Sequence, residues 1–274
     1  MNHTPNTTPS ASDYREYAPP RSLADHLLCF WTQSITGDSG EYAQRVLPDA
    51  CIDIVFINDQ APVVIGPWVK PFVARLPVAT RIVGARWRPG RAPALFGVPA
   101  VELINQSVVL RDVWSCPLSS SLERVSDEPN LGARRSALGA ALLNLLAHTA
   151  PGDALVNASI QWLALRPYGR VEQLSQWVAI SSRQLQRRFA NSVGYGPKTF
   201  QSILRFQRLL NSAGRRRHRR SLADLAVEVG YADQAHMSRE VQRLSGCTPT
   251  VLFPSAQCAL EMSDFFKTPP DPEY

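Results

Sequence analysis

The sequence predicts an α+β protein: a mostly-β, barrel-like N-terminal domain, a helical connector, and an all-α C-terminal domain in which a linker helix joins two similar helix pairs. Three observations predict this organisation. Short β-branched runs lie between residues 51 and 87, a repeated helical pattern follows residue 170, and an excess of basic residues coincides with that repeat. We expect a disordered leader at 1–14, an N-terminal domain at 15–115, a connector at 116–150, the helical domain at 151–256 and a tail at 257–274.

Three apolar, β-branched runs predict strands of the N-terminal domain. They are "CIDIVFI" at 51–57, "APVVIG" at 61–66 and "TRIVGARW" at 80–87, with turn residues such as "NDQ" and "GPW" around them. The pieces "APALFG" and "VELINQ" look helical, and residues 131–150 have a longer amphipathic pattern. That last helix could pack on its own domain or serve dimerisation, and the sequence leaves both open.

Positive charge is concentrated in one segment of the chain. Residues 1–169 carry 14 basic and 14 acidic side chains, residues 170–250 carry 14 and 5, and residues 251–274 carry 1 and 4. Residues 170–250 therefore carry a net charge of +9, and the −3 of residues 251–274 reduces this to the +6 of the whole chain. A neutral domain joined to a basic one is typical of proteins in which one domain binds nucleic acid.

A repeat occupies this basic segment. The pattern "VEQLSQWVAISSRQLQRRFANSVGYGP" at 171–197 returns at 222–249 as "LADLAVEVGYADQAHMSREVQRLSGCTP". Each copy predicts a short helix, a tight turn and a second helix, with Ser181 or Ser182 and Asp233 as N-caps. Gly230 stands in the second turn, where a residue tolerant of positive φ is needed. This arrangement predicts two helix-turn-helix motifs.

The second helix of each copy has a core face and a polar face. Leu185 and Phe189 are four residues apart in the first copy, and Met237 and Val241 repeat this spacing in the second. Arginine and glutamine on the other faces can make bidentate contacts with base edges in the major groove. A solvated charged face is the alternative, but two tandem copies with matching core positions argue against it. The polar faces carry Arg183, Gln186 and Arg187 in the first copy and Gln234, Ala235, Ser238 and Arg239 in the second.

Residues 197–213 predict the linker helix, about 25 Å long. A rigid helix of that length could hold two recognition helices roughly one DNA turn, about 34 Å, apart. The run "GRRRHRR" at 214–220 then predicts a loop, because Gly214 suits a helix C-cap and like charges repel one another. Its arginines should contact phosphate, which sets affinity and salt dependence but not base preference. The predicted phosphate contacts are Arg188, Arg205, Arg215, Arg216, Arg217, Arg219 and Arg220.

Residues 154–253 resemble the DNA-binding domain of the AraC family of bacterial transcription regulators. The resemblance is carried by "SSRQLQRRF", "GYGPKTFQSILRFQRLL" and "GYADQAHMSREVQRLSGCTP". The family usually has phenylalanine where Met237 and Val241 stand, and commonly glycine where Ala179 stands. These apolar or small replacements affect packing detail and leave the expected fold unchanged.

The resemblance implies a DNA-binding transcription regulator and not an enzyme, with the seven polar-face residues contacting bases of double-stranded promoter DNA. Family members usually activate and sometimes repress transcription by contacting RNA polymerase, a partner implied here by kinship alone. No apolar run reaches the roughly 18 to 20 residues of a membrane span, and the polar first residues contain no signal peptide. We therefore expect a cytoplasmic, nucleoid-associated bacterial protein without a membrane partner; a homodimer is left open.

The segments "LPDACIDIVF", "GPW" and "GARWRPGRAPALFGVPAVEL" resemble a poorly characterised sensor domain found with AraC-type domains. That resemblance implies a sensory role and names no ligand. Aromatic and charged side chains suit a small-molecule effector pocket. However, tryptophans of β domains usually lie in the core, and arginines that alternate around Trp87 usually face water. The candidate pocket residues are Trp31, Asp49, Asp53, Trp68, Arg86, Trp87 and Arg88.

The sequence predicts neither a cofactor nor a metal site. Five cysteines are scattered without a CxxC pair, and five histidines show no HxH or HExxH spacing. The first alternative function is a cupin-like enzyme, which would require a cluster of histidine and carboxylate ligands. A non-specific nucleic-acid binder, the second, would not need arginine and glutamine at matched positions of two repeats. Cys51 lies in an apolar strand, away from any zinc-binding cysteine cluster of the DNA-repair type, so we expect it to be inert.

Overall fold

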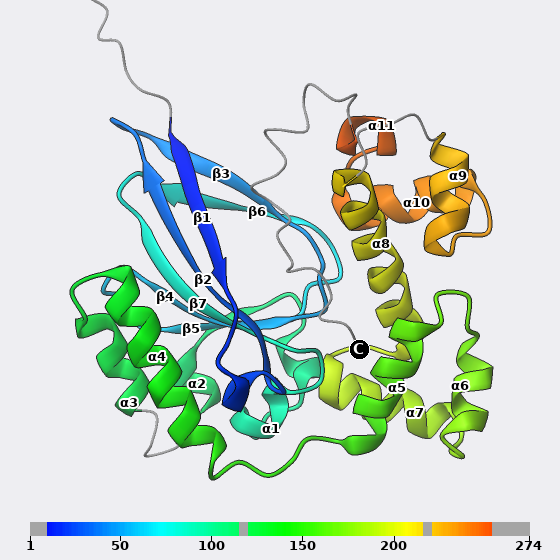
Figure 1. The fold of residues 1–274 in the computed structure, drawn as a ribbon, viewed down its shortest axis with the longest axis horizontal. Coiled ribbons are helices and arrows are strands. Elements are labelled where there is room, and N and C mark those ends of the chain that lie inside the picture. The colour runs from blue at the N-terminus through cyan, green and yellow to red at the C-terminus, as the bar shows by residue number, and fades with distance from the viewer. Residues whose placement is uncertain (1–9, 115–119, 216–220, 254–274) are drawn as a thin grey trace, which may run out of the picture.

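The computed structural model describes residues 10–114, 120–215 and 221–253, and it confirms an α+β fold (Figure 1). The strands are β1 Ala11–Tyr17, β2 Leu27–Thr36, β3 Glu41–Val46, β4 Ile52–Ile57, β5 Val63–Ile65, β6 Phe72–Pro77, β7 Arg81–Trp87 and β8 Ser107–Val109. The helices are α1 Ala92–Phe96, α2 Leu110–Val113, α3 Ser120–Glu123, α4 Leu131–Leu146, α5 Ala154–Leu165, α6 Val171–Trp177, α7 Ser182–Val193, α8 Pro197–Arg215, α9 Leu222–Val229, α10 Gln234–Ser245 and α11 Pro249–Leu252. Short 3-10 helices lie at Arg21–Leu23, Ala100–Leu103 and Arg124–Asp127.

The N-terminal domain contains two antiparallel sheets. The larger has the order β1-β2-β7-β4-β5-β8, and β3 pairs with β6 to form the smaller. The three β-branched runs of the sequence became β4, β5 and β7. β1 pairs with β2 along its whole length, from Ala11 opposite Thr36 to Tyr17 opposite Phe30. The leader expected at 1–14 therefore overlaps a strand, while residues 1–9 and the predicted tail lie outside the described residues.

Strand alternation gives the larger sheet two different faces. Along β7, Val83, Ala85 and Trp87 are buried in the main core of the domain, whereas Ile82 and Arg86 face the smaller sheet. Successive side chains of a strand point to opposite faces, so the two sets cannot mix. One face is thus committed to packing, and the other is available to line a cavity.

Helix α4 covers the packed face of the larger sheet (Figure 1). Its Leu138 and Leu142 are fully buried in the same cluster as Trp87. The side chain of Asn130 accepts a hydrogen bond from the N–H of Ala133 and so caps the helix. The connector expected at 116–150 is therefore largely part of the N-terminal domain, because a helix with this apolar stripe is stabilised by burying it on the sheet.

The C-terminal helices confirm both predicted helix-turn-helix motifs. α6 and α7 form the first, α9 and α10 the second, and the predicted core residues of α7 and α10 are all fully buried. Ser181 and Asp233 cap α7 and α10 as expected, each accepting a backbone N–H of the first turn. Gly230 has φ +99°, and Ala179 takes the equivalent left-handed turn with φ +53°.

Helix α8 joins the two motifs and contacts both. It has 19 residues, which corresponds to about 28 Å. Phe200 packs on Phe189 of α7, with ring centroids 5.9 Å apart. At the other motif, the Ser202 hydroxyl donates to Glu240 Oε1 of α10 at 2.7 Å. The helix continues through Gly214 to Arg215, so the expected C-cap at Gly214 is wrong: α8 absorbs the glycine, a residue tolerated inside a helix at a cost of about 1 kcal/mol.

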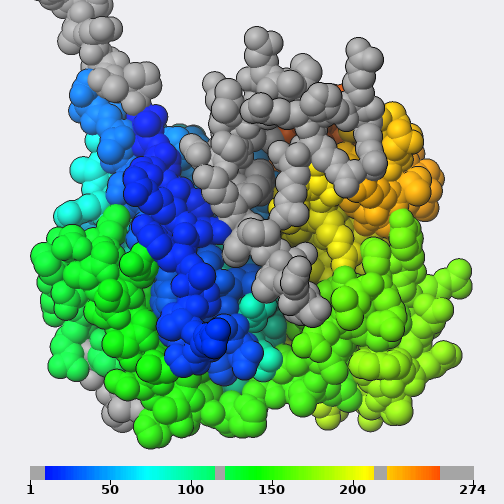
Figure 2. All heavy atoms as spheres, in the orientation of Figure 1, coloured from blue at the N-terminus to red at the C-terminus, as the bar shows by residue number. Residues whose placement is uncertain are grey.

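The two domains lie against each other (Figure 2). Arg45 of β3 donates to the carbonyl oxygen of Ser245, at the end of α10, at 2.9 Å. Gln207 of α8 donates to the carbonyl oxygen of Pro48 at 2.6 Å. Leu47 from the N-terminal domain is buried in the same apolar cluster as the helical domain. Polar and apolar contacts therefore both fix the domains together.

The two turns provide a reciprocal test of backbone strain. We predict that Ala179→Gly raises the free energy of unfolding by about 0.5–1 kcal/mol, because a side chain in the left-handed region costs energy. Gly230→Ala should lower it by at least about 1 kcal/mol, since a Cβ there would also lie 3.1 Å from the Pro167 carbonyl oxygen. Urea unfolding of the full chain measures both; destabilisation by Ala179→Gly would refute the equivalence of the turns.

Candidate nucleic-acid interface and ligand pocket

The recognition helix of the first motif presents its polar face to solvent. Arg183, Gln186 and Arg187 are exposed on α7, while Leu185 and Phe189 are fully buried beneath them. The capping box of Ser181 and Gln184 satisfies backbone groups at the N-terminus of the helix. The side chain of Gln186 lies over Gly196, where a Cβ would come within 2.0 Å of its Oε1. The predicted base-contacting residues of this motif are thus accessible together.

The recognition helix of the second motif repeats this geometry. Gln234, Ala235 and Arg239 are exposed on α10. Ser238 is half-buried, and its hydroxyl donates to the carbonyl oxygen of Gln234 at 2.8 Å. Both helices therefore offer a polar surface of the kind that enters a major groove, and their base contacts remain a prediction.

The arginines assigned to phosphate differ in what they contact. Arg188 is half-exposed and pairs with Asp153 at 2.9 Å, so a phosphate would have to share or replace this ion pair. Arg205 is half-buried, pairs with Glu240 at 3.4 Å, and lies over the ring of Tyr231. These contacts join α8 to α10, and the phosphate contact predicted for Arg205 stays a prediction. Arg216, Arg217, Arg219 and Arg220 lie outside the described residues, as does the side chain of Arg215.

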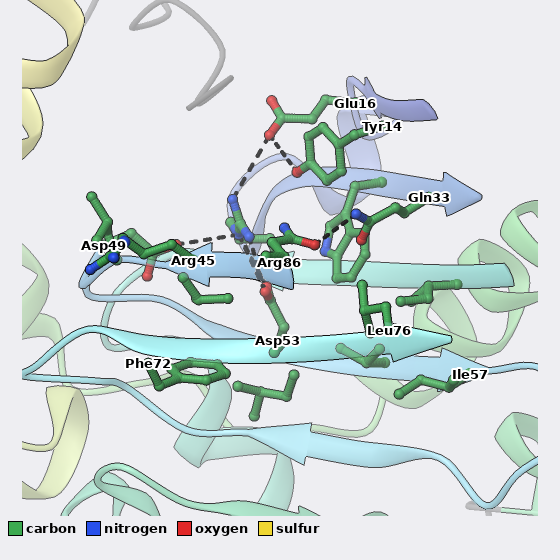
Figure 3. A pocket seen from close by; sticks show the side chains of 18 of the residues that line it. Tyr14, Glu16, Gln33, Arg45, Asp49, Asp53, Ile57, Phe72, Leu76 and Arg86 are labelled. Atoms are coloured by element: carbon green, nitrogen blue, oxygen red, sulfur yellow. Dashed lines mark hydrogen bonds and ion pairs between the residues drawn. The ribbon is translucent and has the colours of Figure 1, made fainter. Parts of the chain in front are cut away.

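A cavity of about 180 Å³ lies between the two sheets of the N-terminal domain (Figure 3). One part of its wall is apolar, and the other is polar. Gln33 of the larger sheet donates to Gln44 of the smaller one at 2.6 Å, which ties the two walls together. The apolar lining consists of Trp31, Val46, Leu47, Val55, Ile57, Ile65, Phe72, Ala74, Leu76 and Ile82.

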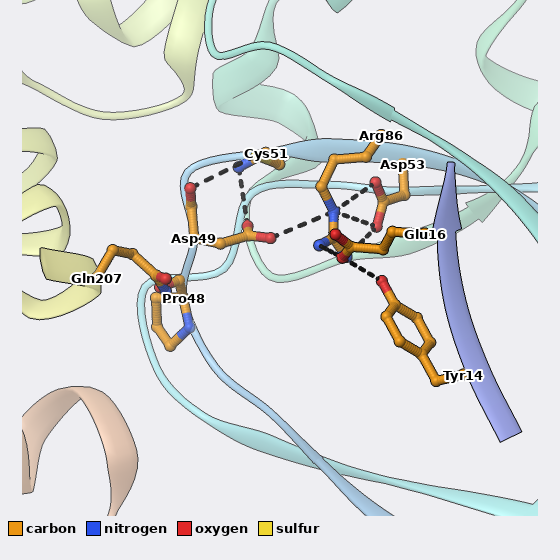
Figure 4. Close-up of polar contacts among 8 residues, drawn as sticks. All are labelled: Tyr14, Glu16, Pro48, Asp49, Cys51, Asp53, Arg86 and Gln207. Carbon is orange, nitrogen blue, oxygen red and sulfur yellow. Dashed lines mark hydrogen bonds and ion pairs between the residues drawn. The ribbon is translucent and has the colours of Figure 1, made fainter. Parts of the chain in front are cut away.

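Arg86 stands at the polar end among three carboxylates (Figure 4). Its guanidinium contacts Asp53 at 3.1 Å, Asp49 at 3.5 Å and Glu16 at 3.8 Å. The hydroxyl of Tyr14 donates to Glu16 Oε1 at 2.7 Å. These side chains come from β1, β4, β7 and the loop before β4, so the sheet register places them together.

Burial and charge act in opposite directions on these acids. Burial raises the pKa of Asp53, while the Arg86 guanidinium lowers it and the Asp49 carboxylate raises it further. Burial likewise raises the pKa of Glu16, against the hydrogen bond from Tyr14 and the charge of Arg86, both of which lower it. The single arginine therefore compensates the desolvation of two buried carboxylates only in part.

Four of the predicted pocket residues do line the cavity: Trp31, Asp49, Asp53 and Arg86. Trp87 does not, because it follows Arg86 in a strand and points into the opposite core, where it is fully buried. Trp68 stacks on Phe72 at 4.0 Å without lining the cavity, and Arg88 donates to the carbonyl oxygen of Ala24 at 2.7 Å. The expectation that the arginines around Trp87 face water is wrong for Arg86, whose side chain is only 18% exposed.

Several lining residues escaped the sequence analysis. Tyr14 and Glu16 lie at and just beyond the end of the expected leader, although their alternation in "SDYREY" is a signal for a strand. Arg45 and Gln207 reach the cavity only through tertiary structure, from β3 and from the linker helix α8. No local pattern marks them.

Two families of domains match the chain. Residues 15–109 match a domain of unknown function (DUF6597), and residues 174–254 match a helix-turn-helix domain of the AraC type. The resemblance found in the C-terminal sequence is thereby confirmed. No protein of curated function matches the chain.

Among solved structures, the chain is similar to ToxT from Vibrio cholerae. An apo ToxT variant shares 10% identity over 90% of this chain and 98% of that chain, with a TM-score of 0.42. ToxT of strain O395 is 8% identical in sequence, and the match covers 89% of this chain and 98% of that chain, with a TM-score of 0.41. ToxT with a bound unsaturated fatty acid is 11% identical, and the match covers 93% of this chain and 98% of that chain, with a TM-score of 0.38.

In the described part of the chain, no group of three or more histidine, cysteine or acidic side chains is placed to hold a metal ion. No described helix combines the length and apolar character needed to cross a bilayer.

Two of the cysteines border the acidic end of the cavity. Cys29 and Cys51 are buried, and burial raises the pKa of both thiols, that of Cys29 to about 12. The nearby carboxylates Glu16, Asp53 and Asp49 raise the pKa of Cys29 further, while Arg86 lowers it. Cys247 is only half-buried. Both thiols of the N-terminal domain should therefore be unreactive.

Alkylation tests this directly. In a chain with Cys116→Ser and Cys258→Ser, we predict that iodoacetamide at pH 8 labels Cys247 about 100-fold or more faster than Cys29 and Cys51, because only thiolates react. Peptide mass spectrometry measures the rates. In urea the three rates should converge, and equal rates in the folded chain would contradict the burial described above.

Proposed function

We propose that this chain, whose C-terminal part is an AraC-type helix-turn-helix domain, is a sequence-specific transcription regulator that inserts α7 and α10 into successive major grooves of promoter DNA. One observation carries the proposal: two recognition helices, each with an exposed polar face, are anchored to the same linker helix. The basic excess between residues 170 and 250 supports binding to a polyanion.

The geometry supports simultaneous contact of both helices with DNA. Helix α8 spans about 28 Å, close to the roughly 34 Å between successive major grooves on one face of the duplex. Arg187 and Arg239 lie on the exposed polar faces of the two recognition helices. In the major groove, the commonest specific contact is a bidentate one between arginine or lysine and guanine. The arginine run at 215–220 is assigned to phosphate, as proposed from the sequence.

The N-terminal domain is proposed to receive the signal. Its cavity is lined by Arg45 and Gln207, which also make the hydrogen bonds between the domains, to Ser245 and Pro48. An effector in the cavity would contact groups that hold α10 and α8 in place. This supports control of DNA binding by ligand occupancy.

Other partners are proposed from kinship with AraC-type regulators. RNA polymerase is the proposed protein partner, activation the proposed direction of control, and the bacterial nucleoid the proposed location; homodimerisation is a further proposal. A cupin-like enzyme and a non-specific nucleic-acid binder are not favoured by any feature of the described residues.

The proposal distinguishes residues that contact DNA bases from residues that contact the DNA phosphates. We predict that Arg187→Ala and Arg239→Ala each relax base preference by about 1–3 kcal/mol at a cluster of adjacent positions. Selection of binding sequences from a random DNA pool, followed by competition binding at fixed salt, measures this. Each variant should lose discrimination at positions different from those of the other.

A triple replacement of Arg215, Arg216 and Arg217 by alanine is the matched control. Because phosphate contacts are independent of sequence, it should weaken all sites evenly and reduce the salt dependence of binding. If the single and triple variants changed base preference alike, the division between base and phosphate contacts would be wrong. A wild-type chain that enriches no sequence would exclude sequence-specific regulation altogether.

A further inference from the structure

We propose that the cavity between the two sheets binds an organic ammonium compound with an aromatic or aliphatic body. The inference deepens the proposed function, on which it rests only for the claim that occupancy is the regulatory signal. The ligand class follows from the charges, the aromatic surfaces and the size of the cavity.

The charges at the polar end favour a cation. Three carboxylates, of Glu16, Asp49 and Asp53, surround the single guanidinium of Arg86. Arg45 is the other basic residue that lines the cavity, and its Nη1 is engaged with the Ser245 carbonyl oxygen at 2.9 Å. The three carboxylates outnumber these two basic side chains by one, and a bound cation would favour the ionised forms of Glu16 and Asp53, whose pKa values are raised by burial. A ligand with one positive charge would neutralise the excess carboxylate.

Aromatic rings stand beside the carboxylates. The rings of Tyr14 and Trp31 lie with their centroids 5.7 Å apart, and both residues line the cavity. Trp31 lies on Gly84 of β7, where a Cβ would come within 2.3 Å of the indole, so the glycine lets the large ring lie flat on the sheet. Aromatic faces attract ammonium groups through their quadrupole, and tryptophan does so most strongly. Carboxylates and aromatic faces together are suited to an organic cation.

The indole N–H of Trp31 is a buried donor in the cavity wall. Trp31 is only 7% exposed, and among the described residues its N–H has no acceptor within full hydrogen-bond geometry. It lies near Asp53 and helps to lower the pKa of that carboxyl, so its interaction with Asp53 is a weak one. A ligand hydroxyl beside the ammonium group would give this N–H a well-aligned acceptor.

The remaining wall fixes the body of the ligand. Phe72 and Leu76 of β6 face Ile57 of β4 across the cavity (Figure 3). A volume of about 180 Å³ is slightly larger than a cavity of about 150 Å³ that binds benzene, so it suits one ring with a short side chain. The ligand should therefore be small, with its cationic end toward Glu16 and Asp53 and its apolar end toward β6.

An anionic ligand fits these groups poorly. A carboxylate would have to pair with Arg86, whose guanidinium already contacts three carboxylates. Its arrival would add a fourth negative charge to a site with little solvent, where like charges repel strongly. The structure thus discriminates between ligands of opposite charge and similar shape.

Three small molecules with one skeleton test the charge preference. Phenylethanolamine carries an ammonium group, phenylethanediol a neutral hydroxyl and mandelate a carboxylate at the same end. We expect isothermal titration of the full chain to show phenylethanolamine binding at least about tenfold more tightly than either of the others. Tighter binding of mandelate or phenylethanediol, or no binding of phenylethanolamine at millimolar concentration, would overturn the inference.

Two variants locate the binding site. Glu16→Gln keeps an acceptor for the Tyr14 hydroxyl and removes one negative charge, so it should weaken phenylethanolamine binding by about tenfold or more. Glu41→Gln is the matched control and should leave binding unchanged. Glu41 is exposed on β3, where it forms an ion pair with Arg75 at 3.8 Å. Thermal unfolding checks that both variants fold. Equal affinities of Glu16→Gln and wild type would place the ligand elsewhere.

DNA binding is measured separately, without any ligand. Enrichment of one DNA sequence together with failure of all amine binding would overturn the ligand class and leave the regulator intact. Amine binding by a chain that enriches no DNA sequence would instead overturn the proposed function and retain the site.

Discussion

The anchoring of both recognition helices to α8 is the constraint on which the remaining structure depends. At one end, Phe200 packs on Phe189 beneath the polar face of α7. At the other, Ser202 and Arg205 both contact Glu240 of α10. Because these contacts are buried and directional, α7 and α10 cannot reorient independently without breaking them. A protein that recognises an extended DNA site needs this rigidity. When the first helix binds its groove, a rigid linker already positions the second helix, and the second set of contacts forms without a further entropic cost.

Strand alternation in the N-terminal domain separates a packed face of the larger sheet from a face that lines a cavity. The face of β7 that carries Trp87 is packed under α4, so the opposite face, with Arg86, can hold polar groups around a cavity. That cavity is continuous with the boundary between the domains, because Arg45 and Gln207 line it and also bridge to Ser245 and Pro48. In the proposed control, a ligand in this cavity would contact groups that hold α8 and α10, without a long path through the protein core.

Local patterns in the sequence predicted most of the helical domain, because caps, turn glycines and the spacing of core residues are encoded within a few residues of one another. Ser181, Asp233 and Gly230 all behave as their residue types predict. The pocket was predicted only in part. Asp49, Asp53 and Arg86 were found, but Trp87 was wrongly added because the face to which a strand residue points depends on the register. The ion pair of Arg205 with Glu240 was not predicted, because the two residues are 35 positions apart in the sequence. Arg45 and Gln207 were missed because only tertiary structure brings them to the cavity, whereas Glu16 was missed because the strand signal next to the expected leader was not used.

Hydroxyl-radical footprinting of the full chain on a selected DNA site tests the role of α8 most directly. Two protected blocks on one face of the duplex, separated by about one helical turn, are predicted from two recognition helices fixed on a helix of this length. Protection of a single groove, or of two blocks on opposite faces, would contradict a rigid α8 that presents both helices to DNA together.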